Sequence, residues 1–206
     1  MPSKFRVRYI FRPVVNLIAK GSRKLGITPN IATIIMLSFA ILSFISISCF
    51  YNLLLFAIFI FLCGIFDGVD GAIARLTNKE TKFGGFFDST MDRFSEFFIF
   101  LGLLIYFWDQ LLWDFIDMKL IIFIAFLFSI LISYSRARAD IIYKGDYDIG
   151  LMARSERFFY LFIAMFVAFF IGLANEFIFL YMWLVIGTFI FRAIKINNQI
   201  KNNLGK

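Results

Sequence analysis

Residues 53–75 read LLLFAIFIFLCGIFDGVDGAIAR, and this stretch decides the class of fold. It is long enough for one membrane-spanning helix, which needs about 20 mostly apolar residues. The stretch ends in Asp67, Asp70 and Arg75, which are costly groups to place near a bilayer. The sequence therefore predicts a transmembrane helix with a polar, functional cluster at one end.

Five further apolar stretches of similar length accompany it. They cover residues 31–51, 86–108, 118–139, 154–174 and 177–196, and the connections between them are short. Of the 206 residues, 61% are hydrophobic and 17% are charged, whereas about a quarter of a soluble domain is charged. This composition excludes a water-soluble globule and a disordered chain. We expect an all-α integral membrane protein with one domain over residues 1–206, in which six transmembrane helices form a bundle over 31–196 and 197–206 is a solvated tail.

The segment before the first span is basic and contains no acid. Apolar residues recur at helical spacing over 4–25, which predicts an amphipathic helix lying in the membrane interface. A basic targeting tail is the alternative. The pair Thr28-Pro29 predicts the start of the first spanning helix, because a hydroxyl caps it and proline fits its first turn.

The distribution of charge predicts the orientation of the six helices. If both termini lie on one side, that side holds the basic N-terminal segment together with Arg75, Lys79, Lys82, Arg136, Arg138, Lys144, Arg154, Arg157, Arg192, Lys195, Lys201 and Lys206. The other side holds Lys119 and four acids, Asp109, Asp114, Asp117 and Glu176. The positive-inside rule then predicts a multi-pass protein of the cell membrane with both termini on the cytoplasmic side. The net charge of +7 thus reflects topology and attraction to anionic lipids, so nucleic acid is not an expected partner.

The chemistry available to the chain is limited by two residue types. It has no His, which excludes His bases and His metal ligands. Cys49 and Cys63 both lie in apolar runs without metal-ligand spacing, so they are interpreted as packing residues.

Four carboxylates gather where two spans meet. Asp67 and Asp70 end one helix, Asp88 and Asp92 begin the next, and spacings of three and four place each pair on one helix face. Four clustered negative charges near a membrane need compensation. Ion pairs with Arg75 and Arg93 are one alternative.

Divalent cations are the other alternative. Four carboxylates at this spacing could hold two divalent ions, either Mg²⁺ or, as alternatives, Mn²⁺ or Ca²⁺, because these cations prefer oxygen ligands. Two metals about 3.5–4 Å apart form a clamp for phosphoryl chemistry. Gly68, Gly71, Gly84 and Gly85 beside the carboxylates would let a phosphorylated ligand approach the backbone, although each also suits close helix packing.

The order of these residues resembles a known family signature. Asp67-Gly68-Val69-Asp70-Gly71-Ala72-Ile73-Ala74-Arg75 is followed after eight residues by Gly84, after three by Asp88 and after three more by Asp92. This pattern resembles the signature of the CDP-alcohol phosphotransferases, with every fixed position filled. The resemblance extends to six helices preceded by an interfacial helix.

The resemblance implies specific roles for these residues. Asp67, Asp70 and Asp88 would bind a first metal, Asp67, Asp88 and Asp92 a second, and Asp92 would also be the general base. The CDP part of a lipid donor would lie among Asn30, Thr33, Gly71, Ala74, Arg75, Thr81 and Gly84. An acceptor hydroxyl would attack the phosphorus attached to the lipid, and CMP would leave. Members of the family form homodimers, so a dimer is expected.

A second cluster bears on the acceptor alcohol. Ser133, Arg136 and Arg138 close the fourth span, and Arg154 and Arg157 open the fifth. Arginine forks suit a phosphate group, which predicts a pocket for a small phosphorylated alcohol. The alternative is that cytoplasmic helix ends simply collect arginines.

Residues 133–139 and 150–157 resemble the phosphatidylinositol-phosphate and archaetidylinositol-phosphate synthase branch of the family. That branch joins CDP-diacylglycerol or CDP-archaeol to inositol 1-phosphate, and Ser133, Arg136 and Arg157 would contribute to its pocket. The chain departs from many members at Arg136, where they have Lys, and near Ala153, where they have a second acid. Glycerol 3-phosphate and serine are the alternative acceptors. An ion-coupled transporter is the alternative outside enzymes, because intramembrane acids also mark ion pathways.

Overall fold

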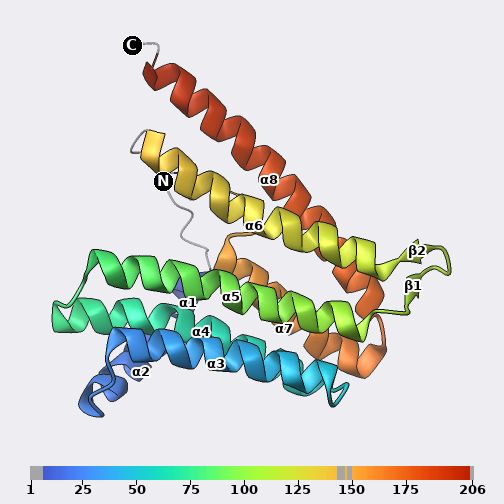
Figure 1. Ribbon diagram of the computed structural model, residues 1–206, viewed down its shortest axis with the longest axis horizontal. Coiled ribbons are helices and arrows are strands. Elements are labelled where there is room, and N and C mark those ends of the chain that lie inside the picture. Colours follow the sequence, from blue (N-terminus) through green and yellow to red (C-terminus); the bar gives the residue numbers. More distant parts are fainter. Residues whose placement is uncertain (1–6, 143–146, 148–149, 205–206) are drawn as a thin grey trace.

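The computed structural model describes residues 7–142, 147 and 150–204. Its helices are α1 (Val7–Ile10), α2 (Arg12–Lys24), α3 (Pro29–Ser48), α4 (Leu53–Thr77), α5 (Lys82–Tyr106), α6 (Met118–Ile142), α7 (Arg154–Ile171) and α8 (Ala174–Leu204) (Figure 1). The prediction of an all-helical chain is confirmed, apart from a two-stranded antiparallel hairpin of β1 (Leu111–Leu112) and β2 (Ile116–Asp117). This hairpin was not predicted from the sequence, and its turn places Trp113 and Asp114 at φ 52° and 64°.

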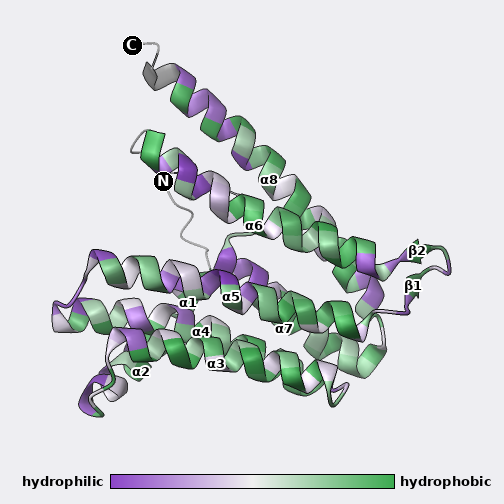
Figure 2. Cartoon of the chain, viewed as in Figure 1, coloured by the Kyte–Doolittle hydropathy of each residue, from purple (hydrophilic) through white to green (hydrophobic). Residues whose placement is uncertain are grey.

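Four of the described helices are long and apolar enough to cross a membrane: α3, α4, α6 and the Ala174–Lys201 part of α8. Helices α5 and α7 occupy two further predicted spans, but charged residues such as Asp92 and Arg154 interrupt their apolar character. Figure 2 shows hydrophilic residues at the linked ends of α4 and α5 and at the start of α7. These interruptions mark the candidate site.

The N-terminal segment is divided into two helices. Residues 4–6 of the predicted interfacial helix lie outside the described residues, and α1 ends before α2 begins at Arg12. Pro13 explains the division, because proline has no amide hydrogen to donate to the preceding turn. One continuous helix was therefore the wrong expectation for the described part of this segment.

Local capping explains where the long helices begin. The Thr28 hydroxyl accepts a hydrogen bond from the Ile31 amide at 3.4 Å, which confirms the predicted start of α3. The Thr81 hydroxyl accepts from the Gly84 amide at 3.0 Å and starts α5 four residues before the predicted boundary at 86.

The last helix is longer than predicted. α8 continues to Leu204, whereas the sequence analysis ended the span at 196 and expected a tail beyond it. Buried Ile196 packs with Ala139 and Tyr147, and Ile200 packs against the same cluster. This apolar contact stabilises helix beyond the predicted boundary.

The packing of the helices determines where the site lies. α3 packs against both α4 and α5, α7 packs against α4, and α6 pairs with α8. In Figure 1 the α6–α8 pair diverges from the other helices toward the C-terminus. Buried side chains such as Met36, Phe56, Ile99 and Leu161 form the main core. The α4–α5 hairpin and the start of α7 are therefore held on a well-packed base.

Gly102 provides a test of the α3–α5 packing. A Cβ at this position would lie 2.7 Å from Ile47 Cγ2 and 3.4 Å from Phe44 Cα. We expect Gly102→Ala to destabilise the protein by about 1–3 kcal/mol, because overpacking forces neighbours to shift. Thermal unfolding in detergent measures this, with Gly187→Ala in α8 as the matched control, since no atom lies within 4 Å of its Cβ position. Equal melting temperatures for the two variants would contradict the prediction.

Candidate active site

Three carboxylates from two helices converge at the centre of the site. Carboxylate oxygens of Asp67 on α4 and of Asp88 and Asp92 on α5 all lie within 4.8 Å of one another. The four-residue spacing of Asp88 and Asp92 places them on one face of α5, toward Asp67. A partly buried, all-oxygen cluster with three negative charges is suited to a hard divalent cation such as Mg²⁺ or Mn²⁺.

One carboxylate oxygen of this cluster supports a metal site. Among the described residues, Asp88 Oδ1 is buried without a hydrogen-bond partner. A buried carboxylate oxygen without a donor is costly, and a cation would relieve that cost. The residues present therefore fit a divalent metal.

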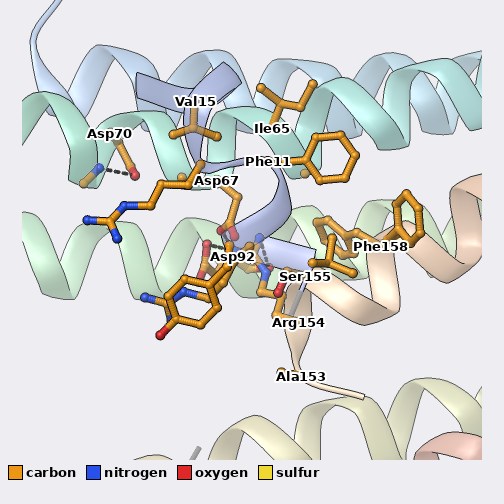
Figure 3. Close-up of a pocket in the computed structure, with 18 of the residues that line it drawn as sticks. Phe11, Val15, Ile65, Asp67, Asp70, Asp92, Ala153, Arg154, Ser155 and Phe158 are labelled. Atoms are coloured by element: carbon orange, nitrogen blue, oxygen red, sulfur yellow. Dashed lines mark hydrogen bonds and ion pairs between the residues drawn. The ribbon is translucent and has the colours of Figure 1, made fainter. Parts of the chain in front are cut away.

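The fourth predicted ligand, Asp70, is held differently. Its Oδ2 accepts a hydrogen bond from Thr33 Oγ1 at 2.8 Å, and its Oδ1 accepts from the Gly71 amide at 2.5 Å. Figure 3 shows Asp70 apart from the converging side chains of Asp67 and Asp92. Asp70 lines the same cavity and its carboxylate neighbours that of Asp88, although Asp70 is not among the three acids whose oxygens all lie within 4.8 Å of one another.

Arg154, predicted to bind the acceptor, lies directly against the acids (Figure 3). Its Nη1 contacts Oδ1 of both Asp67 and Asp92, and its Nη2 donates to Ser95 Oγ at 2.7 Å. Its guanidinium also lies 4.9 Å from the centre of the Phe158 ring. Arg154 is thus a counter-ion within the acid cluster as well as part of the cavity wall.

A cavity of about 640 Å³ opens beside these groups. Its charged lining is contributed by Asp67, Asp70, Arg75, Asp88, Asp92, Arg136 and Arg154, together with Arg8 and Arg12 of the N-terminal helices. One wall is therefore acidic, and arginines from several elements border the same space. Such a cavity can hold a metal ion and an anionic, phosphorylated ligand side by side.

The predicted CDP-lipid residues fall into two groups. Gly71 and Arg75 line the cavity, whereas Ala74 does not. At the adjoining end of α3 and α5, the Cβ position of Gly84 lies 3.0 Å from Thr81 Oγ1 and 3.8 Å from Asn30 Oδ1. Thr33 is bonded to Asp70 and so positions that carboxylate.

Gly68 lines the cavity and also packs against the N-terminal helix, so both interpretations of this glycine remain open. Its Cβ position lies 3.3 Å from a methyl group of Val15 on α2. Gly68 therefore allows α2 to pack closely on α4.

The residues predicted to bind the acceptor also lie in different places, some at the cavity and some away from it. Arg136 and Arg154 line the cavity, whereas exposed Arg138 lies outside its lining. Arg157 is 0% exposed, and its Nε and Nη2 donate to Glu96 Oε1 at 2.9 and 2.6 Å. Its Nη2 also donates to Ser133 Oγ at 3.2 Å. Arg157 and Ser133 thus belong to a buried network and are not part of the cavity lining.

The sequence analysis missed Glu96, Ser95 and two N-terminal arginines. Glu96 follows Asp92 by four residues, as Asp92 follows Asp88, so helical spacing was the available signal. Ser95 precedes it by one residue and bonds Arg154. Arg8 and Arg12 gave no such signal, because a basic N-terminal helix is interpreted first as a membrane-surface helix.

The fold and site define a membrane-embedded enzyme that handles phosphorylated substrates at an aspartate cluster. Residues 26–194 match the model of the CDP-alcohol phosphatidyltransferase family, and the chain belongs to this family. The sequence resemblance is thereby confirmed, and the transporter alternative is set aside.

Individual relatives and solved structures show which members of the family the chain resembles. The chain is 36% identical to the archaetidylinositol phosphate synthase of Pyrococcus horikoshii over 161 residues, which cover 77% of this chain and 80% of the relative. It resembles the crystal structure of Mycobacterium tuberculosis phosphatidylinositol phosphate synthase with CDP-DAG bound, with a TM-score of 0.76 and 25% identity, covering 89% of this chain and 94% of that one. The same enzyme in complex with manganese and citrate also gives a TM-score of 0.76, with 26% identity and 88% coverage of both chains. The resemblance to this branch of the family is confirmed.

Proposed function

We propose that the protein transfers the phosphatidyl-type group of a CDP-lipid to a hydroxyl of inositol 1-phosphate and releases CMP. The observation that supports this most directly is one cavity bordered by the cluster of Asp67, Asp88 and Asp92 and by Arg136 and Arg154. The acids suit a metal-bound pyrophosphate, and the arginines suit an acceptor with its own phosphate. The similarity to an archaetidylinositol phosphate synthase and to a phosphatidylinositol phosphate synthase supports inositol phosphate over other phosphorylated alcohols.

Asp67, Asp70, Asp88 and Asp92 would hold two Mg²⁺ ions, with Mn²⁺ as the alternative, and these would polarise the donor's phosphoryl oxygens. Asp92 accepts the proton of the acceptor hydroxyl as its oxygen attacks the phosphorus attached to the lipid. A new phosphorus–oxygen bond forms, the bond to the CMP oxygen breaks, and CMP leaves with that electron pair. Arg136 and Arg154 orient the acceptor through its phosphate.

The donor would lie along α3, α4 and the start of α5. Asn30, Thr81 and Gly84 lie together there, and Gly71 leaves space beside Arg75 at the cavity. We assign the CDP group to these residues together with Thr33 and Ala74. Both diacylglycerol and archaeol tails are compatible with the apolar helix surfaces.

The membrane arrangement is part of the proposal. All of α3 to α8 span the cell membrane, both termini and the active site face the cytoplasm, and the N-terminal helices lie in the interface. The excess of Lys and Arg at one end of the predicted spans supports this orientation. A homodimer is proposed from the family resemblance.

CMP release by the purified protein tests the proposal. We expect release with a CDP-lipid, Mg²⁺ and inositol 1-phosphate, and loss of release with EDTA that Mg²⁺ or Mn²⁺ restores. Glycerol 3-phosphate and serine are compared in parallel, with diacyl and archaeal donors. Preference for glycerol 3-phosphate would change the acceptor but keep the phosphate site, and preference for serine would contradict the assigned role of the arginines.

A further inference from the structure

The N-terminal helices contribute to the cavity as well as to the surface. Arg8 and Tyr9 of α1 and Arg12 of α2 line the cavity beside the acid cluster. Basic interfacial helices usually meet lipid headgroups. Here two of their arginines border the space in which the reaction would occur.

Aromatic contacts fix this segment in place. The Phe11 ring lies 5.6 Å from the Phe61 ring of α4 and 5.8 Å from the Phe159 ring of α7, measured between centroids. One turn further on, Val15 packs against Gly68 of α4. The segment that contains Arg8 and Arg12 is therefore held over the cavity by α4 and α7 together.

The two arginines are available for a ligand. Arg154 already contacts Asp67 and Asp92, whereas no ion pair is found for Arg8 or Arg12 within the part of the chain that the structure describes. Both side chains are exposed, and the Arg8 guanidinium lies 5.6 Å from the ring centre of its neighbour Tyr9. Two uncompensated guanidinium groups beside one cavity favour a phosphate dianion.

Their position favours the acceptor over the donor. Phe11 anchors the segment to α7, the helix that begins with Arg154 and Ser155 at the cavity wall. Of the proposed donor residues, Asn30 and Gly84 lie together at the start of α3 and α5, outside the cavity lining, whereas Gly71 and Arg75 share the cavity with the N-terminal arginines. Because the donor's pyrophosphate is assigned to the acid cluster, the acceptor's phosphate is the group left for the N-terminal arginines of the same cavity.

We propose, on the basis of the function proposed above, that Arg8 and Arg12 bind the phosphate monoester of the acceptor and determine the preference for a phosphorylated alcohol. Together with Arg136 and Arg154 they surround this phosphate from α1, α2, α6 and α7. The N-terminal segment is thus a specificity-determining part of the active site.

The test compares three variants. Arg8→Gln and Arg12→Gln should each raise the KM for inositol 1-phosphate about tenfold or more, because each removes a charge-assisted hydrogen bond. The KM for the CDP-lipid should change less than about twofold. Arg23→Gln is the matched control, since Arg23 is an exposed arginine of the same helix α2 and does not line the cavity. It should leave both constants unchanged.

Calorimetric titration with inositol 1-phosphate gives a second readout that does not depend on turnover. Weaker binding in Arg8→Gln and Arg12→Gln, with wild-type binding in Arg23→Gln, would support the inference. Equal effects of all three substitutions, or an equal rise in the KM for the CDP-lipid, would overturn it, because surface charge or donor binding would then explain the arginines. Absence of CMP release from the wild-type protein would instead contradict the proposed function, and the titration would still decide between the variants.

Discussion

Asp92→Asn is expected to reduce CMP release by at least about 10²–10⁴-fold, the range that general-base catalysis contributes. Asparagine keeps the shape of the side chain but can neither accept the acceptor's proton nor supply negative charge to the cluster with Asp67 and Asp88. Steady-state CMP release measures the loss. Asp92 lines the cavity whereas the proposed donor residues Asn30 and Gly84 do not, so some CDP-lipid binding should remain, and equilibrium binding of the donor checks this.

Asp109→Asn is the matched control for this substitution. Asp109 is exposed between α5 and β1, and it lies outside the cavity lining. Its substitution should leave CMP release unchanged. Near-normal activity of Asp92→Asn would remove Asp92 from the role of base.

Breaking the buried pair of Glu96 and Arg157 should have the largest effect on stability. The two side chains are 2% and 0% exposed, and Arg157 Nη2 lies 2.6 Å from Glu96 Oε1. Glu96→Ala or Arg157→Ala leaves one buried charge without its partner, which costs about 3–5 kcal/mol. We expect a large fall in the melting temperature of either single variant in detergent.

A double variant distinguishes this pair from a substrate site. Glu96→Leu combined with Arg157→Met should recover most of the lost stability, because apolar residues replace both charges. Arg138→Ala, at an exposed position outside the cavity, should leave stability unchanged. If Arg157→Ala instead keeps wild-type stability and raises only the KM for the phosphorylated acceptor, Arg157 belongs to the acceptor pocket as the sequence predicted.

The acid cluster could be predicted from sequence because its geometry is local. Asp88 and Asp92 are one helical turn apart, and a short hairpin joins their helix to that of Asp67. The orientation of the Asp70 carboxylate also depends on Thr33, which lies 37 residues away and donates a hydrogen bond to it only in the folded chain. Local spacing does not contain that contact.

The sequence likewise did not show which of the arginines line the cavity and which are buried away from it. Arg154 and Arg157 are one turn apart on α7, yet Arg154 contacts the acids at the cavity while Arg157 is buried against Glu96 of α5. Which of two neighbouring arginines is buried depends on how α5 and α7 pack. The break at Pro13 was in contrast a local signal that the sequence analysis did not use.

We propose above that the protein transfers a lipid phosphoryl group to inositol 1-phosphate. Mass spectrometry of the lipid products, alongside quantified CMP, tests it most directly. We predict one molecule of CMP for each new lipid that contains a phosphodiester to inositol and a second, monoester phosphate. Release of CMP with phosphatidic acid or its archaeal counterpart, independent of the acceptor, would show hydrolysis in place of transfer and would contradict the account.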